Sequence, residues 1–472
     1  MEITGDVFKT IIEQYMVPLI PVADLKSKDN TGQQISRIVR IDKCPKRIAA
    51  KPKTVSLYKA YKKHYWYFCP RQKKPEFFYK LLLSCKVDNI AVMTGILNCV
   101  LSAVSRFQIG DREEIKYYLE PLCQAAVTLG ISTHLTEGDK RFTLTKAIEA
   151  LEYWSKRSYE GKKVPFGIII DFDYNRKNKN PNFIDFLKSK YSASFTDGVF
   201  SAMLVDYKGC IIEHIALSTE DSVELEEKEI QTRDYPFTPT RFKSFSRLCD
   251  MNKVGLIAVS NGDILIIKNK QLCFAKREGV WQAFDYSTYF RPCLENTLHF
   301  IETGTDPESK KATERISKTV YQSILDASFS HSGACIAIID FIEDNKKKLD
   351  TVLHNCQITE DYDPSDKSIT LTMREKQAVL RTLTQYSQTP GLFVDLSSKL
   401  RVELLSMDGA VILDNEGKVR AVGAILKIAP GSEEGGRFAA AKKLSYFGIS
   451  FKVSEDGGIT GLYKGKTVCK IG

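Results

Sequence analysis

Two stretches of this sequence, residues 141–285 and 311–472, carry the same order of elements, and this repeat constrains the fold more than any other feature. In each stretch the pattern predicts a helix, then a buried apolar strand, and later an Asp-Gly pair that begins a hairpin. Between the strand and the Asp-Gly pair, the first stretch has a second predicted helix and the second stretch has a longer insertion. These pairs are Asp197-Gly198 and Asp408-Gly409. We therefore predict an α/β fold, in which a mixed central sheet flanked by helices is present twice.

The match continues beyond the Asp-Gly pairs in the same order. The paired segments are Met203–Ile212 with Val411–Val419, Thr240–Ser244 with Gly436–Ala440, Val259–Ile264 with Val453–Ile459, and Lys268–Lys270 with Lys464–Lys466. The difference in residue number between paired segments changes along the chain, and differences in loop length account for this change. The alternative is that strands and turns of this kind coincide by chance.

The repeat sets the predicted domain boundaries. A segment with breaker residues, near Asp285 to Lys310, separates a first domain over residues 141–285 from a second over 311–472. Residues 1–140 are then an accessory domain, which we predict to be largely helical. Apolar residues at spacings of three and four support helices from about Phe77 to Leu135.

The second repeat carries the best candidate for a binding site. Asp408-Gly409-Ala410 begins an apolar hairpin, and Gly435-Gly436-Arg437 opens a short helix. The first backbone N–H groups of a helix have no partner within it, so they can bind an anion. Ser454 and Glu455 follow, at the end of a predicted strand. A carboxylate beside a tight glycine, followed by glycines and an arginine, could hold a metal and a triphosphate.

These residues resemble the diadenylate cyclase (DAC, DisA N-terminal) domain, through the order DGA-V-I, a loop, G-x-R-x-x-A-A and V-S-E-x-G. The resemblance implies condensation of two ATP into cyclic di-AMP with Mg²⁺ or Mn²⁺. It implies three groups of residues: catalytic Asp408, Gly409 and Ala410; phosphate-binding Gly435, Gly436, Arg437, Ser454 and Glu455; and metal-binding Asp408 and Glu455.

The sequence departs from the family at one motif, because Arg437-Phe438-Ala439 stands where the family has Arg-His-Arg. The first repeat resembles a degenerate copy of the same domain, because Asn261 stands where the family has Glu. Its matching residues are Asp197, Gly198, Thr240, Arg241 and Ser260. Since two such domains face each other in the family, the repeats are expected to pair within one chain or between two copies.

The positive charge of the chain is concentrated near its start. Residues 26–75 contain fifteen Lys or Arg and two acidic residues, a local net charge of +13, whereas the whole chain carries +10. Tyrosine, tryptophan and phenylalanine are interleaved with these charges. This composition predicts either a surface that contacts nucleic acid or a solvated basic face over an aromatic core.

Other classes of site have little support. The twelve cysteines form no CxxC motif, and the six histidines show no metal-binding spacing. The most apolar stretch, Ile90 to Val104, is shorter than a membrane span and favours a buried helix. The first residues show no signal-peptide pattern. We therefore expect a cytoplasmic protein that has no membrane partner.

Three classes of function remain open from the sequence. The first is an active diadenylate cyclase. The second is a sensor that binds a nucleotide or cyclic dinucleotide without turnover. The third is a nucleic-acid-binding protein that acts through residues 26–75.

Overall fold

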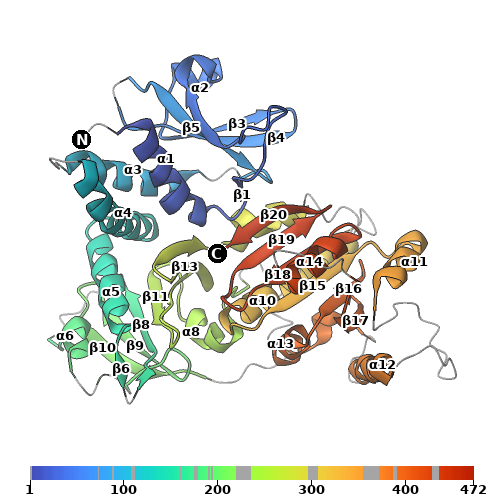
Figure 1. The fold of residues 1–472 in the computed structure, drawn as a ribbon. Helices are drawn as coiled ribbons and strands as arrows, with labels where there is room; N and C mark the ends of the chain where they lie inside the picture. Colours follow the sequence, from blue (N-terminus) through green and yellow to red (C-terminus); the bar gives the residue numbers. More distant parts are fainter. Residues whose placement is uncertain are drawn as a thin grey trace. The chain divides into compact units, whose positions relative to one another are not determined.

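The computed structural model describes residues 3–72, 74–87, 90–107, 112–159, 161–174, 179–189, 192, 195–218, 235–295, 307–354, 371–385, 391–427 and 435–472. The chain forms two compact units, one of residues 1–220 and 236–289 and the other of residues 221–235 and 290–472 (Figure 1). Residues 1–140 belong to the first unit, together with the first repeat. Their separation into an accessory domain stays a prediction.

A five-stranded sheet dominates the start of the first unit. Its strands are β1 (Ala23–Asp24), β2 (Arg37–Arg40), β3 (Val55–Ala60), β4 (Lys63–Phe68) and β5 (Phe77–Leu83), beside helices α1 (Gly5–Ile11) and α2 (Lys46–Ala50). Strand β5 lies between β4 and both β1 and β2. The helix predicted to begin near Phe77 is therefore wrong at its start, because Phe77–Leu83 forms a strand that pairs antiparallel with β4 and β2.

Three helices connect this sheet to the first repeat. They are α3 (Ala91–Arg106), α4 (Arg112–Leu135) and α5 (Lys140–Trp154). Trp281 Nε1 donates to Thr128 Oγ1 of α4 at 3.0 Å, which ties this helix to the last strand of the next sheet. The apolar stretch Ile90 to Val104 is helix α3, and it buries Ile96, Leu97 and Val100. Of the helices that the structure describes, none combines the length and the apolar character needed to cross a membrane.

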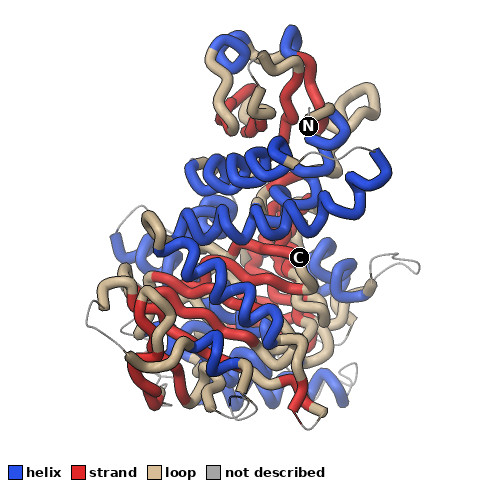
Figure 2. The backbone as a smooth tube through the Cα atoms, turned by 90° about the vertical axis from the view of Figure 1, so that its left-hand side faces the viewer, coloured by secondary structure: helices blue, strands red, loops and turns tan. Residues whose placement is uncertain are grey.

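The first repeat is a seven-stranded sheet in the order β10-β9-β8-β11-β12-β13-β14. The strands are β8 (Phe166–Asp171), β9 (Ser201–Asp206), β10 (Ile211–Ala216), β11 (Lys253–Ala258), β12 (Ile264–Lys268), β13 (Gln271–Arg277) and β14 (Val280–Ala283), after a small ribbon of β6 (Ser158–Tyr159) and β7 (Lys162–Lys163). Helix α5 packs along β11 and β12 (Figure 2). The short helices α6 (Phe183–Leu187) and α8 (Lys243–Arg247) complete the repeat.

The second repeat is a six-stranded sheet in the order β17-β16-β15-β18-β19-β20. Its strands are β15 (Ala334–Ile339), β16 (Ala410–Leu413), β17 (Val419–Ala424), β18 (Gly448–Val453), β19 (Ile459–Tyr463) and β20 (Lys466–Ile471). Its helices are α9 (Arg291–Glu295), α10 (Pro307–Phe329), α11 (Glu343–Val352), α12 (Leu371–Gln385), α13 (Ser398–Ser406) and α14 (Gly436–Leu444).

The two sheets share one topology. In each, the first strand pairs parallel with the second and antiparallel with the strand after the short helix. The strand order from β10 to β13 then equals the order from β17 to β20. The predicted mixed α/β fold in two copies is confirmed.

The hairpin turns of the two repeats use the same hydrogen bonds. Asp206 Oδ1 accepts from the N–H groups of Lys208 and Cys210, at 2.8 and 2.9 Å. Asp414 Oδ1 accepts in the same way from Glu416 and Lys418, both at 2.9 Å. A buried aspartate that receives two backbone N–H groups fixes the turn, so both hairpins keep one geometry.

Strand β15 forms the centre of the second sheet, and all six of its residues are buried. Cys335, Ala337 and Ile339 pack with Ala441 and Leu444 of α14 in one core cluster. Because strand residues alternate, the intervening isoleucines face the other side of the sheet. This burial on both faces explains the continuous apolar run in the sequence.

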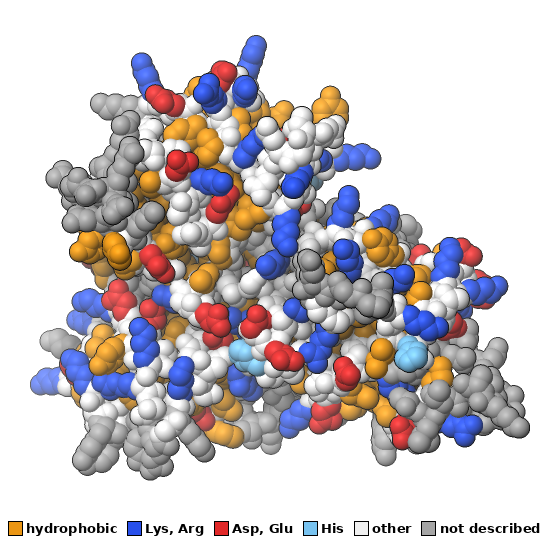
Figure 3. Space-filling model, in the orientation of Figure 1, with side chains coloured by type: hydrophobic (Ala, Val, Ile, Leu, Met, Phe, Trp, Pro, Cys, Tyr) orange, Lys and Arg blue, Asp and Glu red, His pale blue; other side chains and the backbone are white. Residues whose placement is uncertain are grey.

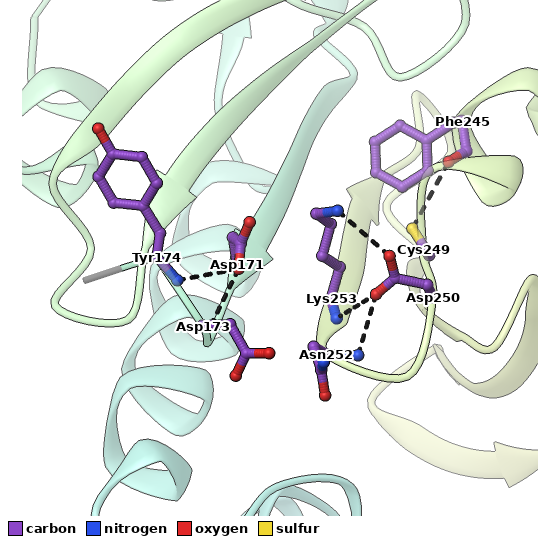
Figure 4. A network of polar contacts seen from close by, with 8 residues as sticks. All are labelled: Asp171, Asp173, Tyr174, Phe245, Cys249, Asp250, Asn252 and Lys253. Atoms are coloured by element: carbon purple, nitrogen blue, oxygen red, sulfur yellow. Dashed lines mark hydrogen bonds and ion pairs between the residues drawn. The ribbon is translucent and has the colours of Figure 1, made fainter. Parts of the chain in front are cut away.

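In the seven-stranded sheet of the first repeat, two aspartates cap neighbouring loops where β8 ends and where β11 begins (Figure 4). Asp171 Oδ1 accepts from the N–H groups of Asp173 and Tyr174, at 2.9 and 3.1 Å. Asp250 accepts from the N–H groups of Asn252 and Lys253 and also pairs with Lys253 Nζ at 3.2 Å. Asp171 is the last residue of β8 and Asp250 lies in the loop before β11, and both make these bonds to residues two or three positions along the chain.

Replacing Asp414 tests how much the buried turn aspartate stabilises the second unit. Asp414 also accepts from Arg420 Nε at 2.7 Å, and both side chains are largely buried. Asp414→Ala should lower the free energy of unfolding by about 3–5 kcal/mol, because it removes the carboxylate of a buried ion pair as well as the acceptor of the turn bonds. Asp206→Ala loses only the turn bonds and should cost about 1–3 kcal/mol. Urea unfolding of both variants measures the difference, and equal losses would contradict the assignment.

Candidate functional site

The predicted site residues of the second repeat come together at one edge of its sheet. Parallel pairing sets Ile336 of β15 opposite Val411 of β16, and antiparallel pairing sets Ala334 opposite Val453 of β18. The chain before β15, the chain before β16 and the loop after β18 therefore meet. We call this the glycine-rich edge and define it by residues 333, 408–409, 423, 435–437 and 454–458.

The Asp-Gly pair is a close crossing of two backbones. Gly409 has φ +108°, and a Cβ added there would lie 2.4 Å from the carbonyl carbon of Gly423. Gly423 itself has φ +54°, and its own Cβ would meet the Asp408 carbonyl oxygen at 2.9 Å. Only glycine fits both positions. The carboxylate of Asp408 is left on an exposed residue beside this crossing, and Ala410 is the buried first residue of β16.

Arg437 reaches across the edge from the first turn of α14. Its Nη1 lies 3.1 Å from Glu455 Oε1, with 33% of the Arg437 side chain and 79% of the Glu455 side chain exposed. A Cβ on Gly333 would lie 2.1 Å from Arg437 Nη1, so the guanidinium covers that glycine. Burial raises the pKa of the Cys335 thiol to about 12, and the positive charge of Arg437 partly opposes this shift.

The loop after β18 is held by its own hydrogen bonds. Ser454 donates its hydroxyl to the Gly458 carbonyl at 3.0 Å, and the Gly458 N–H donates to Asp456 Oδ1 at 3.1 Å. Interactions with the Ser454 side chain and then the Gly458 N–H lower the pKa of Asp456. The Glu455 carbonyl contacts His331 Nδ1 at 3.0 Å. Ser454 therefore shapes the loop, while Glu455 presents its carboxylate outward.

Helix α14 begins with an uncapped N-terminus. Gly435 stands at the N-cap with φ +82° and ψ +158°, and no side chain makes a capping hydrogen bond in the described part of the chain. Gly435 and Gly436 are both exposed. Phe438 points the other way, because it packs against the core cluster with Ala440, Ala441 and Leu444. Ala439, the third residue of the Arg437-Phe438-Ala439 motif, has no side-chain hydrogen-bond donor.

A resident metal does not fit these residues by themselves. In the described ranges, no three His, Cys, Asp or Glu side chains gather closely enough to hold a metal ion. Of the two predicted ligands, Glu455 already pairs with Arg437. The metal assignment stays a prediction, and Mg²⁺ would reach this edge only with the phosphates of a nucleotide supplying further oxygens.

The first repeat arranges the corresponding edge differently. The Asp-Gly pair of the second repeat directly precedes its strand, whereas Asp197-Gly198 lies three residues before β9 begins at Ser201. Asp197 Oδ1 accepts from the N–H groups of Val199 and Phe200, both at 2.8 Å, so this carboxylate caps its own turn. Thr240 opens a short 3-10 helix, and exposed Arg241 lies over the Phe242 ring. The two Asp-Gly pairs are therefore not structurally equivalent.

The loops after β11 and β18 also correspond differently from the sequence match, by one residue. Both β11–β12 and β18–β19 are joined by five residues, 259–263 and 454–458. Asn261 Oδ1 accepts from the Asp263 N–H at 3.0 Å, as Asp456 does from Gly458. Asn261 therefore corresponds to Asp456, and Ser260 corresponds to Glu455 rather than Ser454. The same one-residue difference occurs at the next turn. Asn269 and Lys464 are both left-handed, so Lys464 corresponds to Asn269 rather than to Lys268.

A buried ion pair closes this loop in the first repeat. Arg277 Nε lies 3.3 Å from Asp263 Oδ2, and the two side chains are only 5% and 8% exposed. The equivalent of Asp263 in the second repeat is Gly458, which carries no side chain. At this loop position the first repeat therefore has a buried ion pair, whereas the second repeat has a glycine.

Several residues at the edge were missed by the sequence analysis. Gly333, Gly423 and His331 contact the predicted residues, and Lys376 of α12 donates to the Gly423 carbonyl. The glycines flanking predicted strands were a usable signal of close backbone approach. Nothing in the local sequence marks Lys376, since its contact joins positions far apart in the chain.

Comparisons with known proteins assign no family. No family model matches the chain, and no curated protein matches it significantly. Solved structures that match include a double mutant of DacA from Staphylococcus aureus, with 16% identity, 35% of this chain and 91% of that chain covered, and a TM-score of 0.21. A hypothetical membrane spanning protein from Bacillus cereus matches with 15% identity over 34% of this chain and 73% of that chain, also at 0.21. Likenesses this weak carry no argument about function.

The two glycines that open α14 allow a matched test of this edge. Gly435 occupies a backbone region that is essentially restricted to glycine, so Gly435→Ala should cost about 1–3 kcal/mol of stability. Gly436 has ordinary helical geometry with no atom within 4 Å of an added Cβ. Gly436→Ala should therefore be neutral or stabilise by up to about 1 kcal/mol. Denaturant unfolding compares them, and equal effects would contradict this geometry.

Proposed function

We propose that the glycine-rich edge of the second repeat binds the phosphate groups of a nucleotide, and that the chain does not condense this nucleotide. The uncapped N-terminus of α14 beside Arg437 is the observation that carries the proposal. The backbone N–H groups after Gly435 supply donors, and the helix dipole adds partial positive charge. Arg437 adds a planar guanidinium suited to phosphate oxygens.

The ion pair of Arg437 does not prevent this binding. Because Glu455 is mostly exposed, its interaction with Arg437 is worth at most about 1 kcal/mol. A phosphate that carries more negative charge and also bonds the N-terminus of α14 would displace the carboxylate. Glu455 then acts as a weak internal competitor for the phosphate position.

Two features argue against condensation. Phe438 packs its ring against the core, so the second position of the motif offers no polar group to the substrate. In the first repeat, the loop that corresponds to residues 454–458 is occupied by the buried Asp263–Arg277 pair. A reaction between two facing nucleotides requires two binding edges, and this ion pair makes the first repeat a poor second edge. A sensor that binds nucleotide without turnover fits both features.

The second candidate function is a diadenylate cyclase. Asp408 favours it, because this carboxylate lies on an exposed residue at the same edge as Arg437, as the family resemblance implies. ATP would bind with Mg²⁺ or Mn²⁺, and a second copy of the chain would supply the facing nucleotide. This arrangement would bring two open edges together without using the first repeat.

The central test is nucleotide binding by Arg437 variants. Titration calorimetry of the intact chain with ATP and Mg²⁺ should show saturable binding, and Arg437→Ala should weaken it about 10- to 100-fold, the effect of losing a charged hydrogen bond. Glu455→Gln should bind equally or more tightly, because the competing carboxylate is neutralised. Arg241→Ala, at the matching position of the first repeat, is the control and should leave affinity unchanged.

The same samples separate the two candidates. Mass spectrometry after incubation with ATP and Mn²⁺ should detect no cyclic di-AMP. A product that is made by the natural chain and lost in Asp408→Asn would establish the cyclase instead. Absence of any nucleotide binding would overturn both candidates.

A further inference from the structure

The basic segment, residues 26–75, includes β2, β3 and β4 of the five-stranded sheet, and its positive charge lies on the protein surface. All fourteen of its described lysines and arginines are exposed: Lys26, Lys28, Arg37, Arg40, Lys43, Lys46, Arg47, Lys51, Lys53, Lys59, Lys62, Lys63, Arg71 and Lys74. Lys and Arg side chains gather on the upper part of the surface, where Figure 1 shows α2, β3 and β4 (Figure 3). We call this the basic sheet. Across the described ranges, no ion pair joins Lys59, Lys62 or Lys63 to a carboxylate.

Most aromatic residues of this segment are core residues. Tyr65, Trp66, Tyr67 and Phe68 of β4 are all buried, so they are unable to stack on a base at the surface. Tyr61 is the exception, because its side chain is fully exposed at 100%. Of the two alternatives predicted for this segment, a solvated basic face over an aromatic core therefore describes β4. It does not describe the hairpin tip, where Tyr61 is exposed.

The two residues at the tip of the β3–β4 hairpin adopt a left-handed backbone conformation that their side chains disfavour. Tyr61 and Lys62 both have positive φ, +46° and +65°. The other two-residue hairpins with this geometry place Asn or Gly at one position: Asn269–Lys270, Glu278–Gly279 and Lys464–Gly465. A bulky residue in this conformation is strained, and such strain concentrates at functional positions. Here the strained turn projects an aromatic ring into solvent among lysines.

We propose that the basic sheet binds single-stranded nucleic acid, with Tyr61 stacking on an unpaired base and the surrounding lysines neutralising phosphates. Exposed aromatic rings beside a positively charged surface bind single strands with little sequence preference. A duplex offers no free base face to Tyr61. None of these residues belongs to the glycine-rich edge, so the proposal does not depend on nucleotide binding there.

An anionic membrane is the competing partner, and the composition of the surface disfavours it. Interfacial binding needs an apolar face beside the basic one. Among the described residues of 26–75, the exposed large apolar side chains are Leu57, at 37%, and Tyr61. Two separate side chains do not form such a face, whereas phosphate binding needs only the charges.

Fluorescence anisotropy of the intact chain with a labelled single strand of about 20 nucleotides tests the proposal at about 50 mM salt. Tyr61→Asn should weaken binding about 5- to 100-fold, as expected for one lost stacking contact. Asn suits the turn, so its melting temperature should match or exceed that of the natural chain. A triple Lys→Glu variant at Lys59, Lys62 and Lys63 should bind at least about tenfold more weakly.

The control reverses three exposed lysines elsewhere, Lys310, Lys311 and Lys347, and should change affinity less than about threefold. No binding by the natural chain, or an equal loss in the control, would overturn the proposal. So would an unchanged affinity of Tyr61→Asn, because the stacking contact would then be absent. Equal binding of duplex, or tighter binding to phosphatidylserine vesicles, also excludes a single-strand surface.

Discussion

Each repeat depends on one central strand that pairs in opposite senses with its two neighbours. β8 and β15 run parallel to the next strand in sequence and antiparallel to the strand that follows the short helix. This pairing gathers chain segments far apart in sequence at one edge. In β15 every residue is buried, so a one-residue slip would exchange the side chains between two filled faces. The register is therefore fixed, and the glycine-rich edge follows from it.

The two repeats keep the same framework and differ at their edges. Asp206 and Asp414 cap identical turns, because each turn is needed to return the chain into the sheet. At the edge, Asp263 and Arg277 fill the first repeat with a buried ion pair, whereas the second repeat has Gly458 in that loop. The framework and the edge therefore depend on different residues in each repeat.

Features set by short-range chemistry could be predicted from the sequence. The helix opened by Gly435-Gly436-Arg437 and the hairpin that follows Asp408-Gly409 depend on turn residues and local apolar pattern, and both were predicted. Strand Phe77–Leu83 was missed, because its apolar residues fit either period and only its neighbours β2 and β4 decide between them. The one-residue shift at Asn261 was missed because strand pairing, rather than residue identity, defines equivalence there.

The sequence by itself determined that an α/β unit occurs twice, where its turns lie, and that positive charge is concentrated in residues 26–75. Only the tertiary structure decided that Arg437 covers Gly333 and pairs with Glu455, that Phe438 faces the core, and that Tyr61 alone among its aromatic neighbours is fully exposed. The reason is physical. Turns and helix starts depend on neighbours along the chain, whereas burial and ion pairing depend on residues that the sheet register brings together.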